Sequence, residues 1–156
     1  MDAGTPLPKS QATASISGRG SGEWVLVVDD ALPLRRLVCM VLSQNGYQVA
    51  EANGGRSALD ILEAQGANMQ LVISDLLMPE MDGFTLIYEA KKLNPQLRFL
   101  PMTGSFTFEE IEDQLIQLGL GKLLHKPFNH LQLLNAVEAV LKAPECSKDL
   151  ASSESL

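Results

Sequence analysis

The sequence predicts an α/β fold in which a five-stranded parallel sheet carries helices on both faces. Short apolar runs alternate with segments of helical periodicity five times along the chain. Alternation at this spacing is typical of strand–helix–strand crossovers, which pack helices against both faces of a parallel sheet. Polar residues also follow several of the apolar runs, as they do at the carboxyl edge of such sheets, where ligands bind.

The predicted strands are short and apolar. Residues 24–28 and 71–74 form continuous apolar or small runs, as expected of strands that are buried on both faces. The remaining predicted strands cover residues 47–52, 97–102 and 123–124. The central one, 71–74, leads into Asp75 and then into a loop that Pro79 and the Asp82-Gly83 pair predict to be tight.

Five helices are predicted between these strands, from apolar residues three and four positions apart. They cover residues 32–42, 58–66, 84–93, 108–118 and 131–141. Pro33 suits the first turn of the first helix, and Asn45-Gly46 suits its end. Asn129 is expected to cap the last helix.

The length of 156 residues suits one domain with tails, and 46% hydrophobic residues are enough for a real core. We expect residues 1–22 to be a disordered leader, because they are rich in Gly, Ser, Ala, Thr and Pro and have few large apolar side chains. Residues 23–143 form the predicted domain. Residues 144–156 are polar and are expected to be a disordered tail.

The composition argues against several classes of function. A net charge of −7 is poorly suited to gripping phosphate backbones, so we expect no direct binding of nucleic acid. No apolar run has membrane-spanning length, and the N-terminal residues lack the apolar segment of a signal peptide. Cys39 and Cys146 form neither a disulfide framework nor a zinc motif, which fits a reducing cytoplasm.

Polar residues follow four of the predicted strands, and these ends should meet at one edge of the sheet. Asp29-Asp30, Asp75, Thr103 and Lys126 occupy these positions. A single strand-end aspartate is most often a cap or turn residue, but four polar strand ends together favour a site. Three carboxylates repel one another unless a cation neutralises them, and hard oxygen ligands select Mg²⁺, with Mn²⁺ as an alternative.

The same residues suit phosphoryl chemistry. Lys126 supplies a positive charge that can meet a phosphoryl oxygen, and Thr103 supplies a hydroxyl donor. Asp75 would be the nucleophile and would form an aspartyl phosphate. The metal and Lys126 would stabilise negative charge on the transferring oxygens.

At these positions the chain resembles the receiver domain of two-component response regulators. The matching motifs are Val-Leu-Val-Val-Asp-Asp at 25–30, Asp-Leu-Leu-Met-Pro at 75–79 with Asp82-Gly83, Thr103-Gly104 and Lys-Pro-Phe at 126–128. They occur in the order and spacing of that family, over residues 24–142. The resemblance implies a flavodoxin-like, doubly wound sheet with strand order 2-1-3-4-5.

The resemblance also implies roles for single residues. Asp75 is the expected phosphoacceptor, and Thr103 and Lys126 would contact the phosphoryl group. Asp29, Asp30, Asp75 and the backbone carbonyl of Leu77 would hold Mg²⁺ or Mn²⁺. The Lys126–Pro127 bond would be cis. The donor would be a histidine kinase or a histidine phosphotransfer protein, and the output an unidentified protein. Such a receiver is a signalling protein that catalyses only its own phosphorylation and dephosphorylation.

Three positions depart from common members of the family. Leu123 stands where many receivers carry an aromatic residue of the output switch. Ala31 follows the acid pair where a polar residue is common, which leaves the metal site intact. Leu77 is apolar at a position that can tune hydrolysis of the phosphoryl group. Because Leu123 has no aromatic ring, we expect signalling to depend on Thr103.

Other functions on an α/β sheet fit the sequence less well. A flavodoxin-like FMN carrier needs a phosphate loop after its first strand, where this chain has Asp29-Asp30. A haloacid dehalogenase-type phosphohydrolase needs Asp-x-Asp, which neither Asp29 nor Asp75 begins. A non-phosphorylated interaction module would be expected to lose the acids or the lysine. The chain is either a free-standing regulator or the receiver of a larger hybrid kinase.

Overall fold

The computed structural model describes residues 20–143. The predicted disorder of residues 1–19 and 144–156 therefore lies outside the described residues. Residues 20–22, at the end of the predicted leader, contact the turn at Asn45 and Gly46. The N–H of Gly20 donates to the carbonyl of Asn45 (2.9 Å), and that of Gly22 donates to the carbonyl of Gly46 (2.8 Å).

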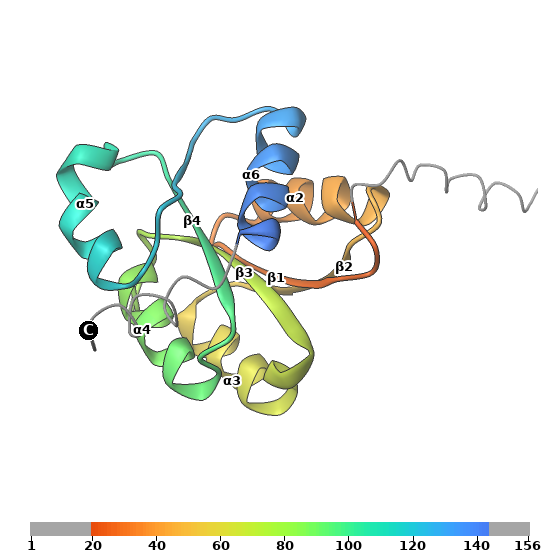
Figure 1. The fold of residues 1–156 in the computed structure, drawn as a ribbon, viewed down its shortest axis with the longest axis horizontal. Helices are drawn as coiled ribbons and strands as arrows, with labels where there is room; N and C mark the ends of the chain where they lie inside the picture. The colour runs from red at the N-terminus through yellow and green to blue at the C-terminus, as the bar shows by residue number, and fades with distance from the viewer. Residues whose placement is uncertain (1–19, 144–156) are drawn as a thin grey trace, which may run out of the picture.

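The sheet has the predicted architecture, with five parallel strands in the order β2-β1-β3-β4-β5 (Figure 1). The strands are β1 (Trp24–Val28), β2 (Gln48–Ala52), β3 (Met69–Asp75), β4 (Arg98–Thr103) and β5 (Leu124–His125). Because every pair is parallel, all five carboxyl ends lie at the same edge. The pairing of Val28 with Ser74 and of Asp75 with Met102 brings the ends of β1, β3 and β4 side by side.

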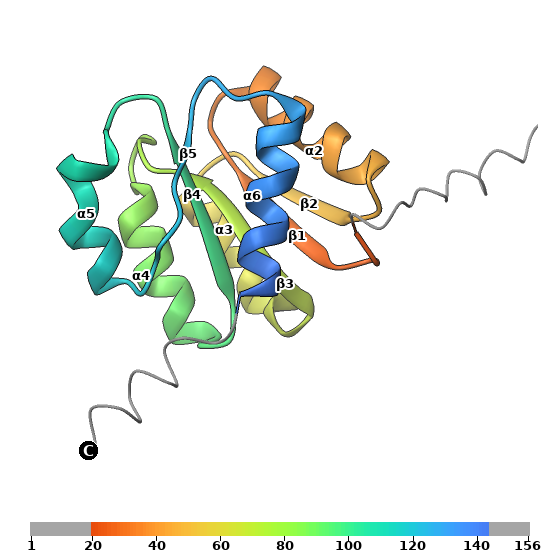
Figure 2. The same ribbon diagram turned by 45° about the horizontal axis from the view of Figure 1, so that its top comes forward.

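Helices cover both faces of the sheet, as predicted. Within residues 20–143 they are α2 (Leu32–Gln44), α3 (Gly55–Gln65), α4 (Gly83–Leu93), α5 (Phe108–Gln117) and α6 (His130–Lys142), with a short 3₁₀ helix, η1 (Gly66–Asn68), after α3. Figures 1 and 2 show α2 and α6 on one face and α3, α4 and α5 on the other. None of these helices is long and apolar enough to cross a membrane.

Each face of the sheet packs its own apolar core. Val72 of β3 packs with the α3–α5 side, whereas its neighbours Leu71 and Ile73 pack with the α2–α6 side. Successive side chains of a strand point to opposite faces, so a strand that is covered on both faces is apolar throughout. This explains the continuous apolar runs on which the prediction of strands depends.

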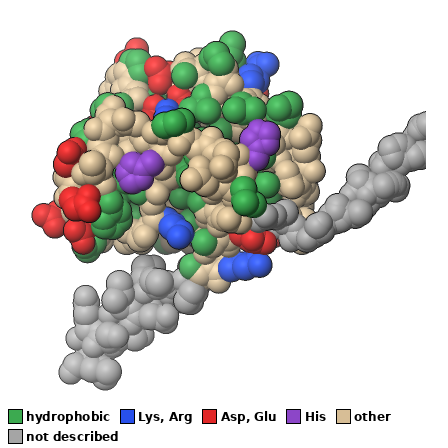
Figure 3. Space-filling view, turned by 90° about the horizontal axis from the view of Figure 1, so that it is seen from above, with side chains coloured by type: hydrophobic (Ala, Val, Ile, Leu, Met, Phe, Trp, Pro, Cys, Tyr) green, Lys and Arg blue, Asp and Glu red, His purple; other side chains and the backbone are tan. Residues whose placement is uncertain are grey.

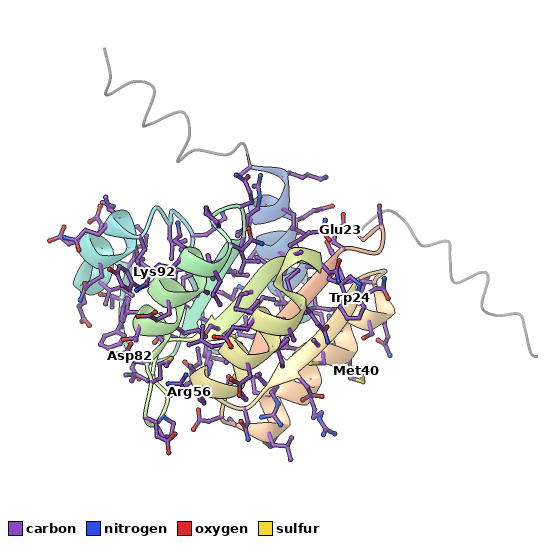
Figure 4. The ribbon with its side chains drawn as sticks, turned by 90° about the horizontal axis from the view of Figure 1, so that it is seen from below. Glu23, Trp24, Met40, Arg56, Asp82 and Lys92 are labelled. Atoms are coloured by element: carbon purple, nitrogen blue, oxygen red, sulfur yellow. The ribbon has the colours of Figure 1, made fainter. Side chains whose placement is uncertain are left out.

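Side-chain caps define where several helices begin. The Asp82 carboxylate accepts a hydrogen bond from the N–H of Thr85 (2.8 Å) at the start of α4, and Lys92 lies in the last turn of the same helix; both are labelled in Figure 4. This placement of acid and base matches the helix dipole. Asn129 forms a capping box with Gln132 at the start of α6, which confirms its predicted role as the cap.

Several boundaries differ from the prediction: α3 begins at Gly55 and β3 at Met69, three and two residues earlier than predicted. The fifth strand comprises Leu124 and His125, one residue later than predicted, because Leu124 pairs with Met102 and His125 with Thr103. Leu123 instead packs, partly buried, against the core on the α3–α5 side. The 3₁₀ helix was not predicted; the Asn94 amide donates to the Gly66 carbonyl (3.1 Å), a contact between segments far apart in the sequence.

Candidate functional site

The carboxyl edge of the sheet holds buried polar residues in a fold whose core is otherwise apolar. Asp29 is 0% exposed and Asp75 is 7% exposed, at the ends of β1 and β3, and Thr103 is buried at the end of β4. Asp30, which follows Asp29, is exposed. A buried carboxylate is costly unless it is paired, so the two buried acids need partners.

The three predicted acids lie together. One carboxylate oxygen from each of Asp29, Asp30 and Asp75 lies within 4.8 Å of the other two. All three ligands would be carboxylate oxygens, and Asp30 faces solvent, so the site suits a hard cation that keeps some of its bound water. The donor set therefore fits Mg²⁺ or Mn²⁺.

Lys126 is the partner of the two buried acids. Its Nζ lies 3.0 Å from Asp29 Oδ2 and 3.2 Å from Asp75 Oδ2. Burial alone would lower the pKa of Lys126, but the hydrogen bonds and charges of Asp29 and Asp75 outweigh it and raise that pKa above its usual value. The side chain is therefore an ammonium ion that neutralises part of the acid cluster at neutral pH.

Asp75 is the carboxylate that burial affects most clearly. Its burial raises the pKa of the carboxyl group, Lys126 opposes the shift, and the charge of Asp29 adds to it. The N–H of Leu77 approaches Asp75 Oδ1 at 3.4 Å, while the Leu77 side chain is about half exposed. Asp75 is thus only partly compensated by its neighbours, and an added cation would stabilise its charged form.

Thr103 anchors the loop that leads to α5. Its Oγ1 accepts hydrogen bonds from the N–H groups of Ser105 (3.0 Å) and Phe106 (3.4 Å). Its carbonyl accepts from the N–H of Lys126 (2.8 Å), so the chain around Thr103 is tied directly to that of the lysine. The hydroxyl proton remains available for donation to a group at the site.

The loop after Asp75 approaches the acid closely. The N–H of Gly83 donates to the Leu76 carbonyl (3.0 Å), and a Cβ at Gly83 would collide with the carbonyl oxygen of Asp75 and with the Leu76 backbone. Glu80 has φ +71°, a left-handed conformation that is uncommon for residues other than glycine. The Lys126–Pro127 bond on the other side of the site is cis, as the resemblance implies.

The structure adds one pair of site residues that the sequence did not indicate. Arg35 of α2 donates from Nη1 to the carbonyl of Asp29 (2.8 Å) and from Nε to Glu51 Oε1 of β2 (2.7 Å). The hydrogen bond from Arg35 lowers the pKa of Glu51, and it outweighs the partial burial of Glu51, which raises that pKa. Arginine and glutamate in these positions carry no sequence signal of a site.

Comparison with known proteins identifies the family. The sequence profile of the response regulator receiver domain matches residues 25–138. The chain belongs to this family. Receiver domains act in two-component signalling, so the motifs at 25–30, 75–83, 103–104 and 126–128 are those of a signalling protein.

Individual relatives agree with this assignment. The chain is 33% identical over 118 residues to the chemotaxis protein CheY of Bacillus subtilis, covering 75% of this chain and 96% of CheY. It is 34% identical over 134 residues to the sensor kinase CckA of Brucella abortus, covering 86% of this chain but only 14% of the kinase. The structure of CheY4 from Vibrio cholerae matches with a TM-score of 0.69 at 32% identity, over 76% of this receiver and 98% of CheY4.

Proposed function

We propose that this receiver accepts a phosphoryl group on Asp75 in a reaction that depends on Mg²⁺. The observation that carries the proposal is the cluster of Asp29, Asp30 and Asp75 oxygens within 4.8 Å, with Lys126 bound to two of the three acids. Burying the carboxylates of Asp29 and Asp75 has a free-energy cost that apolar residues at the same positions would avoid, which favours a functional reason for the cluster.

The donor is a phosphohistidine on a histidine kinase or on a phosphotransfer protein; a small acyl phosphate can replace it. A carboxylate oxygen of Asp75 forms the new bond to phosphorus, while the bond to the leaving imidazole, or to acetate from acetyl phosphate, breaks. Bound Mg²⁺ would supply positive charge for the transferring oxygens. Asp29 and Asp30, with the carbonyl of Leu77, would hold the ion. Lys126 would turn from Asp75 to a phosphoryl oxygen.

Phosphorylation then changes the loop that begins at Thr103. A phosphoryl oxygen on Asp75 would attract the Thr103 hydroxyl. In the unphosphorylated structure this hydroxyl accepts hydrogen bonds from the N–H groups of Ser105 and Phe106. Moving it would break these bonds and release the segment leading to α5. Amide chemical shifts should therefore change more at residues 105–108 than at Leu123, and changes centred on Leu123 with Thr103 unaffected would contradict this route.

The output partner is a protein rather than a nucleic acid. Figure 3 shows acidic side chains gathered at the left of the molecule, over α5, whose acids are Glu109, Glu110, Glu112 and Asp113. This is the helix that the Thr103 loop enters. A strongly acidic surface repels a phosphate backbone, so a basic protein surface is the matching partner. We place the protein in the cytoplasm, where kinases of this class deliver phosphoryl groups.

The test is an intact-mass measurement after incubation with acetyl phosphate. The protein should gain one phosphoryl group in the presence of Mg²⁺ and none in excess EDTA. Asp75→Asn should gain none while remaining folded, because the amide nearly matches the acid in shape. Asp30→Ala should slow the labelling. A label that forms equally well in EDTA, or that persists in Asp75→Asn, would overturn the proposal and leave a non-phosphorylated interaction module as the better explanation.

A further inference from the structure

Both backbone polar groups of Asp29 form hydrogen bonds to residues outside the acid cluster. The N–H of Asp29 donates to the carbonyl of Ala52 at the end of β2 (3.3 Å). β1 ends at Val28, so the carbonyl of Asp29 follows the last residue of the strand. It accepts a hydrogen bond from Arg35 Nη1 (2.8 Å). Because Asp29 is fully buried, solvent cannot take the place of this donor.

Arg35 is itself held in place. Its side chain is 11% exposed, and its Nε lies 2.7 Å from Glu51 Oε1. The planar guanidinium can serve both acceptors at once, which a lysine ammonium on a flexible stem does less well. Arg35 lies near the N-terminus of α2, where the helix dipole disfavours a cation, so the position is not explained by helix stability.

We propose that Arg35 is a positioning residue for the metal site. The Asp29 carbonyl belongs to the peptide unit that joins the two adjacent acids, so a bond to that carbonyl sets the directions in which both carboxylates leave the backbone. Glu51 holds Arg35 in place and balances its charge. The inference rests on the proposed function, because it assigns Arg35 to the same metal-dependent site.

Positioning and simple electrostatics predict opposite results. If Arg35 acted only through its charge, removing it would lower the repulsion on a bound cation and tighten metal binding. If Arg35 orients the acids, removing it should weaken metal binding even though a positive charge is lost. Residues that orient metal ligands typically change metal affinity by about 10–100-fold when they are mutated.

Arg36 provides a matched control. It is the next residue on α2 and also contacts Glu51, at 3.2 Å, but its side chain is 65% exposed and its hydrogen bond is to Glu51 rather than to Asp29. Arg36→Met removes the same charge from the same helix. Val41→Ala, at a buried position of α2, controls for loss of stability without touching the acid cluster.

The experiment measures Mn²⁺ binding to the unphosphorylated protein by electron paramagnetic resonance. Arg35→Met should bind Mn²⁺ about tenfold more weakly than wild type. Arg35→Lys should also bind more weakly, because it keeps the charge but loses the planar fork. Arg36→Met and Val41→Ala should stay within about twofold of wild type. Saturating Mn²⁺ should restore most of the acetyl phosphate labelling rate of Arg35→Met.

Wild-type affinity, or tighter binding, in folded Arg35→Met would overturn the inference while leaving the phosphoacceptor proposal intact. If Arg35→Met does not fold, Arg35→Lys decides in the same way. Equal weakening in Val41→Ala would also overturn it, because general destabilisation would then explain the effect. A wild-type protein that binds no Mn²⁺ would overturn the proposed function and this inference with it.

Discussion

Replacing Lys126 with methionine should destabilise the metal-free protein and should make Mg²⁺ a stronger stabiliser than it is in wild type. The ammonium of Lys126 contacts Asp29 at 3.0 Å and Asp75 at 3.2 Å, and these two acids are buried. Methionine fills a similar volume but supplies no charge. The variant therefore leaves two buried carboxylates, with Asp30 beside them, without their cation.

The magnitude follows from the burial of the three groups. Removing one partner of a buried ion pair typically costs about 3–5 kcal/mol. Two features reduce that figure here: the Lys126 side chain is 21% exposed, and Asp75, whose pKa is already raised by burial, can take up a proton. We therefore expect a loss of about 2 kcal/mol in the free energy of unfolding at neutral pH.

Urea unfolding in EDTA and in Mg²⁺, followed by circular dichroism, measures this loss. Mg²⁺ should raise the free energy of unfolding more in Lys126→Met than in wild type, because the ion no longer competes with the ammonium for the acids. A ligand that binds only the folded state adds about 2.7 kcal/mol to this free energy at a hundred times its Kd. Lys91→Met is the control, since Lys91 lies near the Phe99 ring in the last turn of α4, away from the acids. A loss below about 1 kcal/mol in EDTA, or one that Mg²⁺ leaves unchanged, would refute the reasoning.

Three further predictions concern Asp75 and its loop. Because burial raises the pKa of Asp75 in the folded state, its contribution to stability falls as pH rises from the ordinary carboxyl pKa through the raised one. Asp75→Asn should therefore have a higher free energy of unfolding than wild type at neutral pH in EDTA. Urea unfolding should show that this difference between the two proteins shrinks as the pH is lowered, and a difference that does not change with pH would contradict the raised pKa of Asp75. Gly83→Ala should lower the free energy of unfolding by about 1–3 kcal/mol, because its Cβ meets the Asp75 and Leu76 backbone, whereas Gly54→Ala, with open space around it, should cost little; equal effects would argue against the close approach. Leu77→Asn should speed loss of the phosphoryl group from Asp75, as followed by intact mass, because an apolar side chain shields the acyl phosphate from water; unchanged or slower decay would remove that argument.

The sequence predicts the fold well because the signals it depends on are local. Apolar runs mark the strands, and the parallel arrangement that follows from strand–helix alternation brings the strand ends to one edge. Asp29, Asp75 and Lys126 could be grouped on this basis before any contact was known, and in the structure Lys126 Nζ lies 3.0 Å from Asp29 Oδ2 and 3.2 Å from Asp75 Oδ2. Thr103 lies at the adjoining strand end, on β4.

The details that escaped prediction depend on contacts between distant segments. The two adjacent aspartates cannot be told apart in the sequence, but Asp29 is buried and Asp30 is exposed. The difference arises because β1, which lies between β2 and β3, ends just before them and the chain leaves the sheet there. The contact of Arg35 with Glu51 depends on how α2 packs beside β2, and no periodicity encodes it. The one-residue shift of β5 likewise depends on its pairing with β4.

The central claim is that Asp75 carries the phosphoryl group, and chemical trapping tests it most directly. Borohydride reduces an aspartyl phosphate to homoserine, which peptide mass mapping can place at a single residue. After incubation with acetyl phosphate and Mg²⁺, followed by borohydride, homoserine should appear at position 75 alone. Homoserine at position 29, 30 or 82, or no homoserine in a protein that carries the phosphoryl group, would contradict the account.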